Sequence, residues 1–179
     1  MSEPRPPRPV KIFFAILAAP GADTAALERR IEWEFGEIDL RLPPFPFTQT
    51  DYYEEEMGAG AAKSIVALKP LAPPDSLVDI KLHANRIEKH FARPDGARTL
   101  NIDPGYVDSS RVVLATGKDF AHRLYIGQGI YEELTLMHRR RPPGFEPLPW
   151  TYRDYKLDSV LRFFDRAREA YRAARKENS

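Results

Sequence analysis

The chain has 179 residues, of which 27 are basic, 26 are acidic and none is cysteine. This length suits one domain with a substantial core. The formal charge of +1 gives no whole-molecule attraction to nucleic acid or to a membrane surface, and the lack of cysteine excludes disulfides, thiolate zinc sites and cysteine nucleophiles. The apolar run IFFAILAA is too short to span a bilayer. We therefore expect a cytoplasmic protein without a membrane partner, with a flexible arm over 1–9 and one globular domain over 10–179.

Hydrophobic patterning divides the chain into strands and helices. The predicted elements, in chain order, are a strand over 10–18, a helix over 23–35, strands over 37–42 and 64–69, a helix over 76–91, strands over 99–103, 111–116, 121–126 and 130–137, and a helix over 156–175. This order predicts a single α+β domain with a mixed or antiparallel sheet. Its first part is a ferredoxin-like βαββαβ unit, followed by a late β-hairpin and a C-terminal helix.

The late hairpin is predicted to have one apolar and one polar face. Gly127, Gln128 and Gly129 suit a tight turn with positive φ. If these three residues form the loop, Arg123 faces Glu133 across the hairpin. Apart from Glu132, one face is then apolar, with Leu124, Ile126, Ile130, Leu134 and Leu136. The opposite face carries Arg123, Tyr125, Tyr131, Glu133 and Thr135.

Polar positions on two other elements extend the polar face. In TLNIDPGY, alternation places Asn101 and Asp103 on one side of a strand, after which Asp-Pro-Gly is predicted to turn the chain. On the second helix, a polar stripe runs beside the core face through Lys81, Asn85 and Glu88. Each residue alone has an ordinary structural interpretation as a solvated charge, a turn residue or an ion pair. Only their convergence would indicate a functional site.

The strings FPFTQTDYYEEEMG, KLHANRIE, RTLNIDPGYV, ATGKDFAHRLYI, IYEELTL and PWTYRDY follow one another in this order. Through them the chain resembles, from about Val10 to Tyr155, a bacterial family known as domain of unknown function 4416. The resemblance implies no established reaction. It implies the signature positions Thr50, Asp51, Tyr52, Tyr53, Glu56, Met57, Gly58, Lys81, Asn85, Glu88, Asn101, Asp103, Pro104, Gly105, Tyr106, Lys118, His122, Arg123, Glu133, Thr135, Trp150, Thr151, Tyr152, Asp154 and Tyr155. A signature this polar favours a site over a shared core.

Familiar catalytic motifs are absent from the sequence. GAGAAKS at 58–64 lacks the spacing of a phosphate loop and leads into a strand, and TGKD at 116–119 lacks the spacing of a guanine-reading motif. There is no GxSxG elbow, no HExxH motif and no pair of HxT motifs. His122 is therefore open to two interpretations, as a core histidine or as an acid or base.

Two functional interpretations remain open. In the first, the chain binds a small anionic ligand, phosphorylated or nucleotide-like; whether it is also an enzyme acting on this ligand stays open. Its catalytic candidates are Asp51, Asp103, His122 and Glu133, and its ligand-binding candidates are Tyr52, Tyr53, Lys81, Asn85, Glu88, Asn101, Tyr106, Lys118, Arg123, Thr135, Trp150, Tyr152 and Asp154. Their oxygen ligands suit Mg²⁺ as a cofactor. In the second, an RNA- or protein-interaction module uses the basic loop 138–141 and the N-terminal arm; the first is preferred because short basic runs are common in solvated loops.

Overall fold

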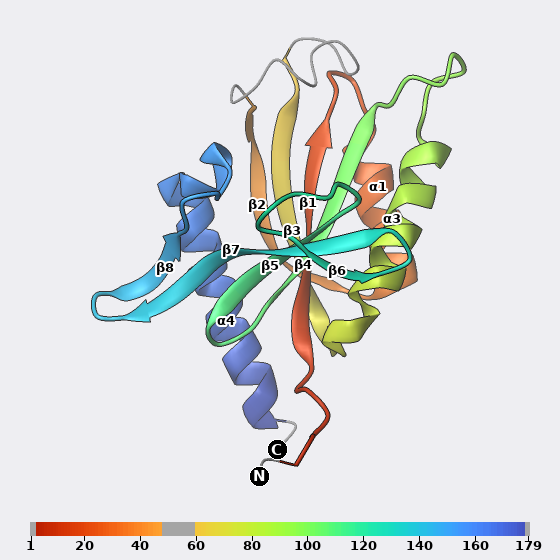
Figure 1. The fold of residues 1–179 in the computed structure, drawn as a ribbon. Helices are drawn as coiled ribbons and strands as arrows, with labels where there is room; N and C mark the ends of the chain where they lie inside the picture. Colours follow the sequence, from red (N-terminus) through yellow and green to blue (C-terminus); the bar gives the residue numbers. More distant parts are fainter. Residues whose placement is uncertain (1–2, 48–59, 178–179) are drawn as a thin grey trace.

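A βαββαβ unit forms the first half of the fold in a computed structural model that describes residues 3–47 and 60–177. Its elements are β1 (Val10–Ala18), α1 (Thr24–Phe35), β2 (Ile38–Pro46), β3 (Ala62–Ala72), α3 (Leu77–His90) and β4 (Leu100–Val107). The strands lie in the order β2-β3-β1-β4, and every neighbouring pair is antiparallel. This is the ferredoxin-like arrangement that the sequence predicts (Figure 1).

The second half extends the sheet beyond β4. Its elements are β5 (Arg111–Thr116), β6 (Leu124–Gly127), β7 (Ile130–Arg140), β8 (Pro143–Pro147) and α4 (Asp158–Glu177). β5 pairs with β4, β7 pairs with β5, and β7 also pairs with both β6 and β8. In Figure 1, β7 crosses in front of the strands of the first half, so the sheet is strongly twisted. The predicted α+β class, late hairpin and C-terminal helix are confirmed.

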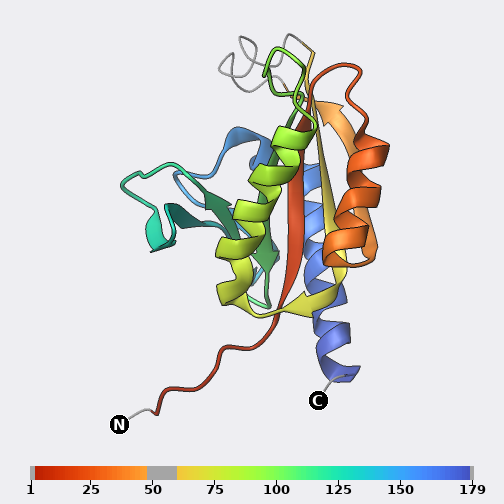
Figure 2. The same ribbon diagram turned by 90° about the vertical axis from the view of Figure 1, so that its right-hand side faces the viewer.

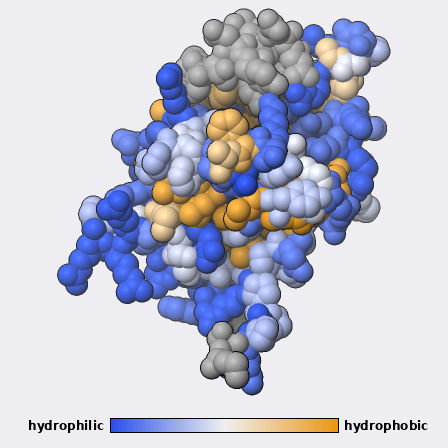
Figure 3. Space-filling view, in the orientation of Figure 1, coloured by the Kyte–Doolittle hydropathy of each residue, from blue (hydrophilic) through white to orange (hydrophobic). Residues whose placement is uncertain are grey.

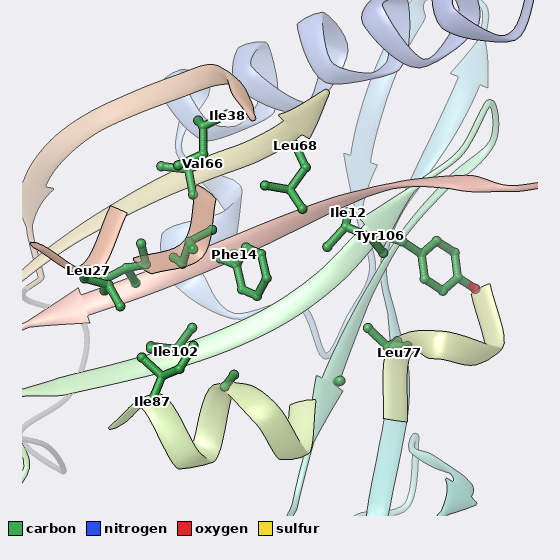
Figure 4. Packing of buried hydrophobic residues seen from close by; sticks show 14 of the residues in the cluster. Ile12, Phe14, Leu27, Ile38, Val66, Leu68, Leu77, Ile87, Ile102 and Tyr106 are labelled. Carbon is green, nitrogen blue, oxygen red and sulfur yellow. The ribbon is translucent and has the colours of Figure 1, made fainter. Parts of the chain in front are cut away.

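Helices cover both faces of the sheet. Figure 2 shows α1 and α3 in front of β1 and α4 behind it. Successive residues of β1 point to opposite faces, so Phe14 packs in one cluster with Leu27 of α1 and Ile87 of α3 (Figure 4). Phe13 packs on the other face, where its ring lies 4.9 Å from that of Phe164 in α4. A strand covered on both faces must be apolar throughout, which explains the unbroken apolar run of β1.

The register predicted for the β6–β7 hairpin is confirmed. Tyr125 lies opposite Tyr131, and their rings are in contact with centroids 5.3 Å apart. Arg123 Nε donates a hydrogen bond of 2.9 Å to Glu133 Oε2. The two charged side chains therefore lie on the same face of the hairpin, as predicted.

The hairpin loop differs from the prediction. Gly127 pairs with Ile130, so the loop has two residues, not three. Gln128 and Gly129 have φ values of 51° and 77°, as the central residues of a type I′ turn require. An irregularity between Tyr125 and Gly127 offsets the shorter loop and preserves the register beyond it.

The prediction that Leu134 and Leu136 share one apolar face of this hairpin is also wrong. Leu134 packs in the cluster beneath α3, whereas Leu136 packs in the cluster beneath α4. The pairing of β5 with β7 shifts between Val112 and Val113, which leaves Thr135 as the extra residue of a β-bulge. The bulge turns Leu136 to the opposite face of the sheet.

Two segments predicted as loops are strand. Asp103-Pro104-Gly105 continues β4 instead of turning the chain. In the predicted basic loop 138–141, residues 138–140 belong to β7 and pair with β8. By contrast, residues 3–9 are exposed and extend away from the sheet (Figure 2).

Candidate functional site

The site forms where β4 and β5 separate. Their pairing is limited to three residues of each strand, and Gly105 opposite Leu114 is its last pair. From Pro104 back to Leu100, β4 is paired with β1 but has no described strand on its other side. β5 continues to Thr116 alongside β7 instead. Two neighbouring strands that diverge in this way leave a gap in the sheet.

Two side chains of α3 occupy the position that a strand would take beside β4. Glu88 Oε1 accepts a hydrogen bond of 2.6 Å from the N–H of Ile102, and Lys81 Nζ donates one of 2.9 Å to its carbonyl oxygen. Lys81 and Glu88 are seven residues apart and therefore lie on one face of the helix. Both are buried. The helix α3 thus provides hydrogen-bond partners for the backbone groups of Ile102 on the open edge of β4, and it closes the gap on that side.

A cavity of about 340 Å³ lies in this gap. Charged and polar side chains from β3, α3, β4, β7 and three connecting segments line it. Among the residues predicted from the sequence, the lining contains Lys81, Asn85, Glu88, Asn101, Asp103, Lys118, Arg123, Glu133, Tyr152 and Asp154. Residues from distant parts of the chain are therefore brought together, as the first interpretation requires.

Asp103 is the centre of one hydrogen-bonded group. Lys81 Nζ lies 2.9 Å from its Oδ1, and Asn101 Nδ2 donates to its Oδ2 at 2.8 Å. Burial alone would raise the pKa of Asp103. The charge and hydrogen bond of Lys81, the charge of Lys63 and the Asn101 hydrogen bond outweigh burial and lower this pKa. Asp103 is therefore a carboxylate at neutral pH, an acceptor and not a proton donor.

Glu133 is the centre of a second group. Its Oε2 accepts from Arg123 Nε at 2.9 Å and lies 3.2 Å from His122 Nε2. The same guanidinium donates to the hydroxyl of Tyr152 at 2.7 Å and to the carbonyl oxygen of Lys118 at 2.9 Å. Arg123 therefore ties the hairpin, the β5–β6 connection and the segment after β8 to one another.

A third group was not predicted as a whole. Lys63, at the start of β3, forms an ion pair with Asp154, and its ammonium lies 4.4 Å from the centre of the Tyr155 ring. Lys63, Arg98 and Tyr155 line the cavity. Tyr155 is a signature position, but none of the three is a catalytic or ligand-binding candidate from the sequence. Lys63 lies in the GAGAAKS stretch, whose spacing does not match a phosphate loop. The acidic Asp154 of PWTYRDY was the available signal that a basic partner exists.

Some predicted residues do not line the cavity. Tyr106 lies in the core cluster on the α3 side, where burial raises its pKa to about 12, with a smaller contribution from Glu132. Thr135 is buried at the bulge of β7. His122 and Trp150 are neighbours of the lining residues, since His122 contacts Glu133 and stacks on Trp150. The remaining candidates, Asp51, Tyr52 and Tyr53, fall outside the described residues.

The side chains of this cavity do not fit the Mg²⁺ cofactor considered from the sequence. Within residues 3–47 and 60–177, no group of three or more histidine or acidic side chains is placed to hold a metal ion. Asp103, Glu133 and Asp154 each contact a basic side chain already. A cation close to any of these carboxylates would lie beside their basic partners, which repel it.

Glu88 provides a test of this arrangement through pH. Burial is the main reason that the pKa of Glu88 is raised, and neighbouring Lys81 offsets only part of the effect. A raised pKa in the folded state means that the favourable contribution of the protonated form is lost as pH rises through that pKa. Glu88→Gln keeps an acceptor for the N–H of Ile102 but cannot ionise. The stability of the variant relative to the wild type should therefore increase with pH.

Urea denaturation of both proteins between about pH 4 and pH 8, a range that begins near the ordinary glutamate pKa of about 4.3 and extends above it, measures this difference. A stability difference that decreases with pH would contradict the burial of an ionisable Glu88 against β4.

No helix in the described part of the chain is long and apolar enough to cross a membrane.

Comparison with known proteins is informative only at the level of the family. The comparison with curated proteins gives no significant match, and the comparison with solved structures gives none either. Residues 8–171 match the family described as a domain of unknown function, DUF4416, and this range includes every residue that lines the cavity. The chain belongs to the DUF4416 family.

Proposed function

We propose that this protein binds a small anionic molecule in the cavity between β4 and β5, and that the molecule also carries hydroxyl or amino groups, as a sugar phosphate or a nucleotide does. A cavity of about 340 Å³ lies within the range of small-molecule sites. Its mixture of apolar wall and convergent polar side chains is also typical of such sites.

The charges of the lining favour an anion. Five basic side chains, Lys63, Lys81, Arg98, Lys118 and Arg123, accompany four acidic ones, Glu88, Asp103, Glu133 and Asp154. The lining therefore has an excess of one positive charge with all groups ionised. Since burial raises the pKa of Glu88, its negative charge is disfavoured in the folded state. Arginine and lysine are the side chains that hold phosphate and carboxylate groups most strongly.

The observation that carries the proposal is a pair of buried polar atoms. Glu133 Oε1 and the hydroxyl of Tyr155 have no hydrogen-bond partner among the described residues, and both side chains line the cavity. A buried polar atom left in this state costs about 1–3 kcal/mol. Burial and nearby acidic groups raise the pKa of Tyr155 well above its usual range, so its hydroxyl is a donor. A ligand with an anionic oxygen for Tyr155 and a donor for Glu133 would satisfy both.

Lys118 gives the cleanest test of anion binding. Its side chain lines the cavity and is exposed, whereas removal of Arg123 would leave the buried Glu133 without its closest cation. Lys118→Gln should therefore leave the fold intact. Loss of one charge-assisted hydrogen bond, about 1.5–3 kcal/mol, should weaken binding of a phosphorylated ligand by roughly 10-fold to 100-fold.

The test begins with a thermal-shift screen of inorganic phosphate, ribose 5-phosphate, glucose 6-phosphate, AMP and UMP against the wild type. Calorimetric titration of the best compound into Lys118→Gln follows. Lys89→Gln is the control, because Lys89 is an exposed lysine of α3 that does not line the cavity. If no compound raises the unfolding temperature, or if the two variants bind equally well, the proposal is wrong.

A further inference from the structure

Large exposed aromatic side chains gather beside the cavity. Phe120 is 64% exposed, Tyr152 is 49% exposed and Trp150 is 40% exposed. Together with His122 they form what we name the aromatic shelf. Figure 3 shows this face of the molecule, where hydrophobic (orange) surface lies among hydrophilic side chains. Exposed apolar surface concentrated at one place marks a contact site more often than single exposed residues do.

The rings of the aromatic shelf are stacked and held in place. The His122 ring lies parallel to Trp150, with centroids 5.5 Å apart and planes 14° from parallel. Phe120 meets the same His122 ring edge-on at 5.3 Å. The indole N–H of Trp150 donates to the carbonyl oxygen of Leu134 at 2.8 Å, so its polar atom is satisfied. An indole fixed at its polar end can offer a flat surface for packing at little entropic cost.

The aromatic shelf is continuous with the anionic-ligand cavity. Tyr152 belongs to both, and its hydroxyl accepts a hydrogen bond from Arg123, another lining residue. His122 contacts Glu133, whose second carboxylate oxygen has no partner in the described part of the chain. Polar groups for an anion and flat rings for a planar group therefore lie side by side.

We infer that the ligand is a nucleotide whose phosphate and sugar occupy the cavity and whose base stacks on the aromatic shelf; this inference rests on the proposed function. A sugar phosphate would use the cavity alone and leave the exposed rings unoccupied. A nucleotide uses both, because every base has a π-face that stacks on aromatic side chains. Phe120 and Trp150 are then binding residues for the base.

Trp150 itself reports on the stacking. The chain has two tryptophans, and Trp33 lies on α1, 86% exposed. In a Trp33→Phe background, all tryptophan fluorescence comes from Trp150. We expect AMP or UMP to quench this fluorescence, whereas ribose 5-phosphate binds without quenching it. The nucleotide should also bind at least about 5-fold more tightly than ribose 5-phosphate, since stacking contributes at least about this factor.

A matched pair of variants separates the aromatic shelf from the cavity. Phe120→Ala should weaken nucleotide binding between about 5-fold and 100-fold and leave ribose 5-phosphate binding unchanged. Leu124→Ala, at an exposed apolar residue of β6 that contributes no ring, should change neither. Equal affinity for the nucleotide and ribose 5-phosphate, without quenching and without an effect of Phe120→Ala, overturns the inference and leaves the proposed function standing. If neither compound binds, nor any other phosphorylated compound of the screen, both fail.

Discussion

Replacing Lys81 with methionine should lower the free energy of unfolding by about 3 kcal/mol. Lys81 Nζ lies 2.9 Å from both the carbonyl oxygen of Ile102 and Oδ1 of Asp103, and the residue is 5% exposed. Methionine fills a similar volume but leaves the carboxylate without its nearest cation and the carbonyl without its donor. The expected loss of stability lies at the lower end of the range for breaking a buried ion pair, because 34% of the Asp103 side chain is accessible to solvent. Urea denaturation at pH 7 measures it.

Two further variants show whether the loss of stability in Lys81→Met comes from the unpaired charge of Asp103. In Lys81→Met/Asp103→Asn the unpaired charge is gone, so more than half of the lost stability should return. Lys89→Met, on the exposed side of the same helix, should change stability by less than about 0.5 kcal/mol. A double variant as unstable as Lys81→Met would show that the charge of Asp103 is not the cause.

The effect of Lys81→Met should also depend on pH. Lys81 lowers the pKa of Asp103 against the opposing effect of burial. The stabilisation from a lowered carboxyl pKa is fully present above the unfolded value of about 3.9 and is lost as pH falls through the folded pKa. The difference between wild type and Lys81→Met should therefore decrease in acid.

Replacing Gly105 with alanine should cost about 3 kcal/mol, the upper part of the usual range for an overpacked core. A Cβ atom added at Gly105 would lie 2.3 Å from the carbonyl oxygen of Val113 and 2.4 Å from Cζ of Phe13. Neither can give way easily, because one is the backbone of β5 and the other is a core ring packed against Phe164. Gly105 forms the last pair between β4 and β5, so relief of the clash would move the base of the cavity.

Gly117→Ala is the control for Gly105→Ala. Gly117 also lines the cavity, but an added Cβ atom there has no described atom within 4 Å. Thermal and urea denaturation should show a large loss for Gly105→Ala and little change for Gly117→Ala. Equal stability of the two variants would contradict the close contact of β4 and β5 at this point.

Most elements of the fold follow from hydrophobic patterning, and the errors have identifiable physical causes. No strand was expected at 143–147, because Pro143, Gly144 and Pro147 are typical strand breakers. β8 tolerates them because its pairing is with β7 alone among the described strands, and an edge strand needs hydrogen-bonding groups on one side only.

The turn predicted at Asp103-Pro104-Gly105 is wrong for a related reason. In a strand, the backbone hydrogen-bonding positions of residues two apart lie on the same side, so those of Pro104, like those of Ile102, lie on the side away from β1. Pairing with β5 begins only at Gly105. The N–H that proline lacks is therefore not needed at this position, and the strand passes through the Asp-Pro-Gly sequence without a turn.

The convergence of the site was predictable only where strand alternation and pairing register are strict. The hairpin register brought Arg123 to Glu133, and alternation along β4 placed Asn101 beside Asp103. Lys63 was missed because the gap between β4 and β5 depends on where their pairing ends, and no local pattern encodes this. Thr135 was assigned to the polar face without the bulge that buries it. Bulges arise from tertiary packing, which periodicity does not contain.

The most direct measurement of the central claim is the change of backbone and side-chain amide NMR signals on titration with the best phosphorylated compound of the screen. We predict that the largest changes occur at Asn85, Asn101, Lys118 and Arg123, which come from three segments of the chain (α3, β4 and the β5–β6 connection) and line one cavity. Signals of residues 138–141 and of the exposed face of α4 should stay in place. Changes confined to residues 138–141, or none at the cavity with a compound that binds, would contradict the claim that these residues form one ligand site.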